Sequence, residues 1–218
     1  MLDRRLVVGD WRYADIQALG ARLAAFYATA RRVDIEPRVY LDRLRAECRL
    51  SRRALLDAGC PGLRHTAENV ARRLDAFMCR RNSPLLRRAE EGRVVEGHGD
   101  LRPEHICLGS TPRIIDCLEF RADLRVLDPV DEIAFLAMEC ERLGAASIGR
   151  ILFYCYCPRT GDCPPPVLII FYKAIGALIR ARIAILHLLE SPVRDPLKWP
   201  KRAAEYLAIA SRQAQHIE

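Results

Sequence analysis

The stretch VVEGHGDLRPEHICL (residues 94–108), followed by RIIDCLEF (residues 113–120), separates two long regions of helix-type sequence. Within and beside it, segments 93–97, 105–108 and 113–117 are short, apolar or β-branched, and bounded by turn-forming residues, a pattern typical of short strands. A polar loop that begins at His98 lies between the first two segments. We therefore expect a few short central strands that support polar loops.

The rest of the chain shows apolar residues at helical spacing. This spacing predicts helices over 13–32, 37–59, 66–92, 131–144, 146–157, 166–190 and 200–215, and CPRTGDCPPP (157–166) predicts a loop. Pro37 and Gly59 suit the start and the end of the second helix, and Thr66 suits the N-cap of the third. The expected fold class is mainly α (α+β), in one domain over 1–218 with a helical part (1–92), strands and loops (93–120) and a second helical part (121–218).

The composition favours a globular protein with a basic surface. Hydrophobic residues make up 50% of the 218 residues, and the formal net charge is +7. A basic balance permits a nucleic-acid, membrane-surface or phosphate-bearing partner. Nearly all the basic residues are arginines, and none of them gathers into a dense run. We expect the excess charge to lie on solvated helix surfaces, with no nucleic-acid partner and no membrane partner.

Cysteine usage and the apolar runs indicate the cytoplasm. Nine scattered cysteines, an odd number, favour reduced thiols over a disulfide framework. The cluster of Cys155, Cys157 and Cys163 lacks the fourth ligand and the paired spacing of a zinc site. The N-terminus has no secretory apolar core, and charged residues interrupt the longest apolar run, 166–189. We therefore expect a cytoplasmic protein that binds no zinc.

The polar loop and the segment after it carry residues suited to phosphoryl transfer. Asp100, a carboxylate in a tight loop, can orient a hydroxyl group and accept its proton. Asp116 offers the oxygen ligand that Mg²⁺ prefers. Arg102 presents a forked set of donors to phosphate oxygens, and Gly99 allows a sharp turn before the aspartate.

HGDLRPEH (98–105) resembles the catalytic loop of the kinase-like phosphotransferases, in the His-Gly-Asp form of the aminoglycoside phosphotransferase family. The segment IIDCLEF (114–120) and a D-x-x-D-E pattern at 128–132 follow it in the order that this family has. The resemblance implies a kinase-like C-terminal lobe that takes ATP and Mg²⁺ (or Mn²⁺) and phosphorylates a hydroxyl of a small molecule.

The same resemblance implies a role for each residue of the motif. Asp100 would be the catalytic base, with Arg102 beside it. Asp116 would hold the metal, and Arg102 and His105 would contact the cofactor, with His105 also at the metal. Structural support of the loop would come from His98, Asp128 and Asp131, although capping of the next helix alone explains Asp131.

Two features depart from the family pattern. His105 stands where the family has an asparagine that ligates a second metal, and imidazole is a poor ligand for Mg²⁺. His105 therefore leaves four alternatives. Mg²⁺ binding is weakened, Glu104 helps to hold the metal, or the site prefers another metal ion. In the fourth alternative His105 only makes a hydrogen bond within the loop. The sequence also lacks a Gly-rich strand pair and a lysine ahead of the loop, so we expect the N-terminal lobe to be absent from this chain. Either that lobe lies upstream or in a separate chain, as for a truncated product or a partial gene model, or the chain is a C-terminal lobe that serves another purpose.

Two hypotheses from different classes follow. One is an ATP-dependent phosphotransferase that acts on a small-molecule hydroxyl, which the presence of Asp100 and Asp116 favours. The other is a catalytically incomplete kinase-like lobe that serves as a binding or interaction module, which the expected absence of a nucleotide-clamping lobe favours. Nucleic-acid binding depends on net charge alone.

Overall fold

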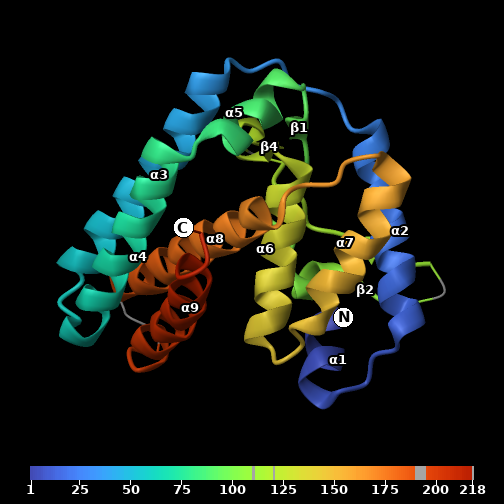
Figure 1. Ribbon diagram of the computed structural model, residues 1–218. Coiled ribbons are helices and arrows are strands. Elements are labelled where there is room, and N and C mark those ends of the chain that lie inside the picture. Colours follow the sequence, from blue (N-terminus) through green and yellow to red (C-terminus); the bar gives the residue numbers. More distant parts are fainter. Residues whose placement is uncertain (110, 120, 190–194, 218) are drawn as a thin grey trace. The chain divides into compact units, whose positions relative to one another are not determined.

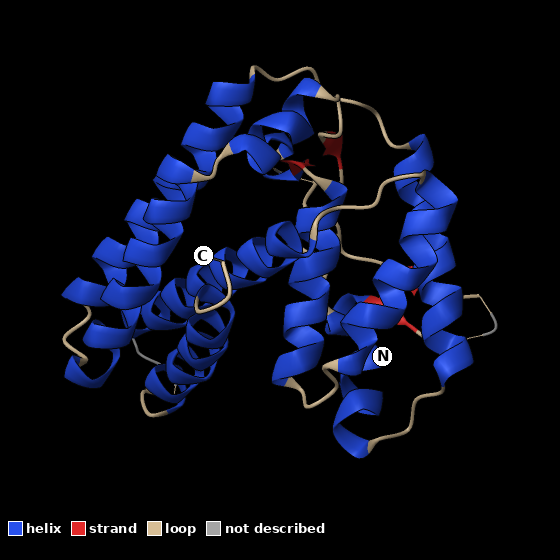
Figure 2. Cartoon of the chain, in the orientation of Figure 1, coloured by secondary structure: helices blue, strands red, loops and turns tan. Residues whose placement is uncertain are grey.

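The computed structural model describes residues 1–109, 111–119, 121–189 and 195–217 (Figure 1). Helices account for 71% of the structure and strands for 4% (Figure 2), which confirms the mainly α fold class. The chain forms two compact units: unit 1 comprises Met1–Ile35 and Arg88–Pro165, and unit 2 comprises Glu36–Arg87 and Pro166–Glu218. Each unit thus combines two separate stretches of sequence, and the organisation as one domain stays a prediction.

The described residues of unit 1 form four complete helices, the end of α5 and the short strands. The helices are α1 (Leu2–Val8), α2 (Tyr13–Thr29), α6 (Pro129–Arg142) and α7 (Ser147–Thr160). Helix α7 packs against α2 and α6 at two glycines. A Cβ at Gly20 would lie 2.7 Å from Cβ of Cys155, and one at Gly149 would lie 2.8 Å from Cβ of Ala137. The small residues therefore allow the helices to approach closely.

The strands of unit 1 form two antiparallel pairs. In one pair, β1 (Val95–Glu96) lies beside β4 (Val126–Leu127), and in the other, β2 (Ile106–Cys107) lies beside β3 (Arg113–Ile114). Short 3₁₀ helices, Pro103–His105 and Ala122–Arg125, precede β2 and β4. The three expected strands are confirmed but shorter, since His105 belongs to the 3₁₀ turn, and β4 had no strand signal of its own.

Unit 2 is built from long helices around an aromatic core. They are α3 (Pro37–Asp57), α4 (Pro61–Arg80), α8 (Pro166–Leu186) and α9 (Lys198–Ala214), with a 3₁₀ turn at His187–Leu189 after α8, whose predicted end at residue 190 lies outside the described residues. The rings of Phe77 and Phe171 stack with centroids 4.9 Å apart. The buried hydroxyls of Tyr40 and Tyr172 are 2.8 Å apart and share a hydrogen bond. Helix α5 (Ser83–Glu90) carries the chain from unit 2 into unit 1.

Local signals predicted some helix ends and missed others. Helix α3 begins at Pro37 and ends just before Gly59, as expected. Thr66 is not an N-cap, because α4 already begins at Pro61. The predicted loop over 157–166 is confirmed for residues 161–165, but its start is wrong, since α7 runs through Pro158 to Thr160. The side chains of Arg159 and Thr160 donate to carbonyls of the preceding turn.

Two further expectations concerned membranes and thiols. Of the helices in the described ranges, none combines the length and the apolarity that a membrane crossing requires. All nine cysteines are free thiols. Cys48, Cys140 and Cys155 are buried, which agrees with the behaviour of cysteine as a small hydrophobic residue.

Candidate functional site

The polar loop of unit 1 makes its sharp turn at Gly99. This residue has φ +88°, a conformation that L side chains rarely adopt. A Cβ there would also lie 3.0 Å from Cδ1 of Leu118 and 3.2 Å from Cγ of Arg125. Both the backbone angle and the lack of space require glycine, so the turn before Asp100 follows from the sequence.

A buried glutamate of α6 holds this turn. The carboxylate of Glu132 accepts hydrogen bonds from the backbone N–H of His98 (3.0 Å), the backbone N–H of Gly99 (2.5 Å) and the hydroxyl of Tyr27 (2.6 Å). Burial raises the pKa of Glu132, while the hydrogen bonds from Tyr27 and the two amides act in the opposite direction. Glu132 therefore ties α2, α6 and the loop into one hydrogen-bonded cluster.

His98 connects the loop to the segment that carries Asp116. Its Nε2 lies 2.8 Å from the carbonyl oxygen of Ile115, and its Nδ1 lies 3.3 Å from the backbone N–H of Asp100. A ring protonated on Nε2 satisfies both contacts, because it donates to the carbonyl and accepts from the amide. The architectural role expected for His98 agrees with this geometry.

The two aspartates lie on opposite sides of the His105 ring. Oδ2 of Asp116 is 3.1 Å from Nε2 of His105, and Oδ2 of Asp100 is 3.8 Å from Nδ1. His105 is buried, whereas the side chain of Asp116 is 74% exposed. Asp116 also has φ +64°, an uncommon angle for a residue other than glycine, and such backbone angles cluster at functional sites. Residues 16 positions apart in sequence thus meet around one imidazole.

Arg102 is enclosed by its own loop. Its Nη1 lies 2.8 Å from Oε1 of Glu104, its Nε 3.0 Å from Oδ2 of Asp100, and its Nη2 3.2 Å from Nε2 of His105. The contact between Nε of Arg102 and Oδ2 of Asp100 is an ion pair, but its geometry is not that of a hydrogen bond. The guanidinium group that we expected to contact phosphate is therefore already paired with two carboxylates.

A buried charge network lies at the start of α6, and its members are only partly those expected. Asp128, which is fully buried, caps α6 by accepting from the backbone N–H of Val130, and both its oxygens accept from Arg88. Arg88 also donates to both oxygens of Asp162, at 2.6 Å each. The expected cap at Asp131 is wrong: Asp131 lies in the first turn of α6, and Asp128 is the N-cap.

The pKa shifts in this network have opposing causes. For Arg88, burial lowers the pKa, but hydrogen bonds to Asp162 and Asp128 outweigh it and hold the pKa above its ordinary value. For Asp162, burial raises the pKa, and the hydrogen bond and charge of Arg88 bring it below its ordinary value. The hydroxyl of Tyr156 donates to Asp162 at 2.7 Å. We call Arg88, Asp128, Tyr156 and Asp162 the buried brace.

The donor set fits a divalent ion only in part. Mg²⁺ prefers oxygen ligands and often takes one or two carboxylates besides substrate phosphates, and the exposed carboxylate of Asp116 fits that role. His105 does not fit it in this arrangement, because Nδ1 lies 2.9 Å from the carbonyl oxygen of Asp100 and Nε2 faces Asp116 and Arg102. Within the part of the chain that the structure describes, no group of three or more His, Cys, Asp or Glu side chains could hold a metal ion.

Sequence reasoning gave no role to Glu132, Arg88 or Asp162. For Glu132 a signal was present: it lies at i, i+4, i+7 spacing with Leu136 and Glu139, all of them on the buried face of α6. An acid within an apolar helical stripe predicts a buried hydrogen-bonded carboxylate. Arg88 and Asp162 are separated by 74 positions, and no local pattern joins them.

Comparisons with known proteins do not identify the function of this site. The chain is 37% identical, over 167 residues, to an uncharacterized protein of Mycobacterium tuberculosis and to one of Mycobacterium bovis. The match covers 71% of this chain and 32% of each relative, so the chain spans about a third of the length of the curated relatives it matches. No protein-family model matches the chain. No solved structure matches it either.

Proposed function

We propose that this chain contributes the catalytic loop of an ATP-dependent phosphotransferase of the aminoglycoside phosphotransferase type, which transfers the γ-phosphate to a hydroxyl of a small molecule. The observation that carries the proposal is the meeting of Asp100 and Asp116 around His105. In kinase-like catalysis one acid must reach the acceptor hydroxyl and another the metal-bound phosphates, so the two must lie close together. The nine free thiols support a cytoplasmic location as part of the proposal.

Each residue then has a task that its position supports. Asp100 orients the acceptor hydroxyl and accepts its proton, and its contact with Arg102 fixes the carboxylate. The rigid turn at Gly99, held by Glu132, keeps Asp100 in place between reactions. When bound, Mg²⁺ with ATP supplies the phosphoryl group and offsets its negative charge, and Asp116 is the residue that would hold the ion.

A second candidate is a binding module with the same fold and no catalysis. One observation favours it: both ring nitrogens of His105, at the position of the family's asparagine, are engaged by groups of the protein. In this hypothesis the contacts among Asp100, Arg102 and His105 stabilise the loop and leave no ligand site. Experiments on Asp116 and His105 can therefore distinguish the two hypotheses.

Phosphate transfer is the direct test. The chain alone should turn over little or nothing, because it lacks the nucleotide-clamping lobe. It is therefore combined with the N-terminal lobe expected upstream or in a separate chain and incubated with ATP, Mg²⁺ or Mn²⁺ and a panel of aminoglycosides and sugars, and ADP release is measured. Because a positioned base typically contributes 10²–10⁴-fold, Asp100→Asn should reduce the rate by about 10²-fold or more. Asp57→Asn, an exposed aspartate on α3, is the matched control and should leave the rate unchanged.

Metal binding separates the two hypotheses. His105→Asn restores an oxygen ligand and should tighten Mg²⁺ binding in the presence of ATP, whereas Asp116→Asn should abolish it. Calorimetry on the folded variants measures both effects. If the wild-type chain binds Mg²⁺–ATP no better than Asp116→Asn, and no acceptor is phosphorylated, the binding-module hypothesis replaces the enzyme.

A further inference from the structure

Two cysteines are neighbours at the end of α7 in unit 1. Cys157 lies in the last turn of the helix and is half-buried, whereas Cys163 follows the helix and is exposed. Burial, followed by the charge of Cys163 and a hydrogen bond with its thiol, raises the pKa of Cys157 to about 11. Such an interaction requires the two sulfur atoms to lie close together.

The backbone between the two cysteines turns back at Gly161. This residue has φ +66°, the left-handed conformation that suits glycine after a helix, and its N–H donates to the carbonyl oxygen of Cys157 at 3.0 Å. The hydroxyl of Thr160 donates to the carbonyl of Tyr156 and accepts from the backbone N–H of Asp162. These contacts hold the chain near the helix end.

The position of Cys163 is also held from both sides. Asp162, the residue before it, belongs to the buried brace and accepts hydrogen bonds from Arg88 and Tyr156. Residues 164–166 after it are three prolines, whose rings fix the backbone angle φ. A backbone fixed in this way keeps the two thiols close and lowers the entropic cost of a bond between them.

Core packing does not explain this pair. Buried cysteines such as Cys48 and Cys140 behave as small hydrophobic residues, but Cys163 is exposed. Within the described residues, the pair also belongs to no group of His, Cys, Asp and Glu side chains that could hold a metal ion. An accessible thiol beside a second thiol is the arrangement in which an oxidant produces a disulfide.

We propose that Cys157 and Cys163 form a reversible disulfide on exposure to hydrogen peroxide, and that this bond secures Asp162 in the buried brace. The disulfide would close a ring of backbone that contains Asp162. A cross-link restricts the unfolded chain, so it should stabilise the segment that presents Asp162 to Arg88.

The chemistry takes two steps. Cys163 reacts first, because it is exposed and because the raised pKa of Cys157 leaves little of that thiol as thiolate. The Cys163 thiolate attacks one peroxide oxygen, the O–O bond breaks, and hydroxide leaves a sulfenic acid behind. The Cys157 sulfur then attacks the Cys163 sulfur and loses its proton, the S–O bond breaks, and water leaves. Two thiols and one peroxide thus give one disulfide and two waters, with two electrons transferred to the peroxide.

This inference does not depend on the function proposed above. Neither cysteine belongs to the loop of residues 98–116, and the reaction uses neither ATP nor a metal. Disulfide formation should therefore be the same in Asp116→Asn as in the wild type, whereas the catalytic proposal requires Asp116. Failure of one proposal is thus distinguishable from failure of the other.

Mass spectrometry of the whole chain tests the proposal. The chain is treated with hydrogen peroxide, its remaining thiols are alkylated, and it is digested with trypsin. Cys157 lies in tryptic peptide 151–159 and Cys163 in peptide 160–173. We expect the two peptides as one linked species that dithiothreitol separates. The yield should not depend on protein concentration, because both thiols belong to one chain.

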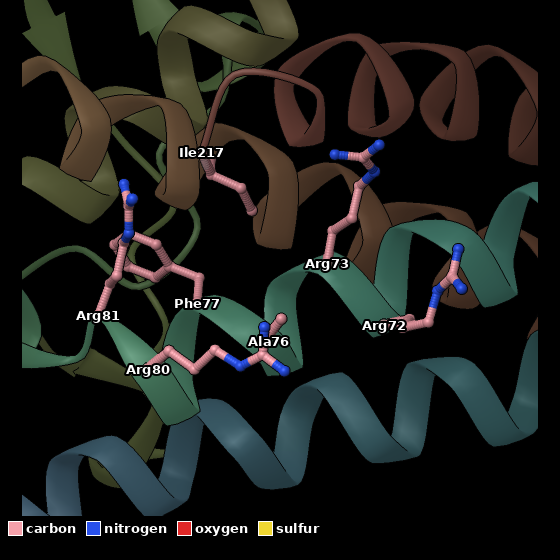
Figure 3. Close-up of a pocket in the computed structure, with 7 residues that line it drawn as sticks. All are labelled: Arg72, Arg73, Ala76, Phe77, Arg80, Arg81 and Ile217. Atoms are coloured by element: carbon pink, nitrogen blue, oxygen red, sulfur yellow. The ribbon is translucent and has the colours of Figure 1, made fainter.

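Substitutions identify the two sulfur atoms. Cys163→Ser, at an exposed position, and Cys157→Ser should each abolish the linked species. Cys155→Ala is the matched control, since Cys155 lies in the same peptide as Cys157 but is buried, and it should leave the linkage in place. Cys79 tests selectivity. It is an exposed cysteine of α4 and does not line the cavity of about 650 Å³ on that helix (Figure 3), and it should remain open to alkylation.

Thermal unfolding tests the role of the bond. Oxidation should raise the unfolding temperature of the wild type and leave that of Cys163→Ser unchanged. An unchanged temperature in the oxidised wild type would overturn the proposal. So would linkage between two chains, linkage through Cys155, oxidation of Cys79 to the same extent, or the absence of any linked species in the folded wild-type chain.

Discussion

Unit 1 and unit 2 differ in how many polar and charged side chains they bury. Among the described residues, nine polar or charged side chains are buried, and eight of them belong to unit 1: Asp15, Arg88, His98, His105, Asp128, Glu132, Glu139 and Asp162. Unit 2 buries only Ser51 of this set. Its core is apolar and aromatic, and exposed arginines remain on α3 and α4.

The contrast indicates what each unit is built to do. A buried charge costs free energy unless it is paired and hydrogen-bonded, and a well-packed apolar core of the same volume is often as stable. Unit 1 nevertheless retains such charges, and one of them, Glu132, binds the backbone of the loop that carries Asp100. Since Glu132 holds the turn at Gly99, we infer that this buried charge serves positioning, whereas unit 2 depends on apolar packing for stability.

Removal of the central arginine of the buried brace should have the largest effect. Arg88→Met removes the guanidinium group that pairs with both buried carboxylates, Asp128 and Asp162, so we expect a loss of about 3–5 kcal/mol in the free energy of unfolding. Urea denaturation measures it. The control Arg81→Met removes an exposed arginine of unit 2 and should cost no more than about 0.5 kcal/mol. Similar losses in the two variants would contradict the contrast between the units.

The effect of Arg88→Met should depend on pH. In the wild type the pKa of Asp162 is lowered, so its contribution to stability is present above the ordinary pKa of aspartate and is lost as the pH falls through the lowered value. Without Arg88, burial would favour the protonated carboxyl group, so the variant should gain stability on acidification. The difference between the two proteins should therefore shrink from pH 7 toward pH 4. A constant difference would show that Asp162 is not the group concerned.

Glu132→Gln should have an intermediate effect. The amide keeps the shape of the side chain but loses one of the two acceptor oxygens that bind His98 and Gly99, so one buried amide is left unsatisfied. We expect a loss of about 1–3 kcal/mol. Hydrogen exchange of the His98 and Gly99 amides should increase more than that of α6. Equal exchange throughout unit 1 would indicate general destabilisation instead of release of the loop.

Tyr172→Phe in unit 2 should have the smallest effect. It removes one hydroxyl of the buried pair with Tyr40 and leaves the apolar core in place. We expect a loss of about 1 kcal/mol, the usual net value of one hydrogen bond. Thermal unfolding measures it. A loss as large as that of Arg88→Met would mean that unit 2 also depends on a polar network.

Short-range sequence patterns predicted several features of this fold. Proline and glycine predicted the limits of α3, because their backbone angles favour a helix start and a helix end whatever surrounds them. The turn at Gly99 was predictable for the same reason. The spacing of apolar residues predicted the mainly α fold class, because helical periodicity is a property of adjacent turns.

Only the tertiary structure determines which charged side chains are buried and which residues they pair with. Asp128 and Asp131 are both acids at the start of α6, yet only Asp128 caps the helix and meets Arg88, 40 positions away. The engagement of His105 by Asp100 and Asp116 likewise depends on how two loops meet. Contacts between distant residues depend on the packing of whole elements, and no local pattern encodes that packing.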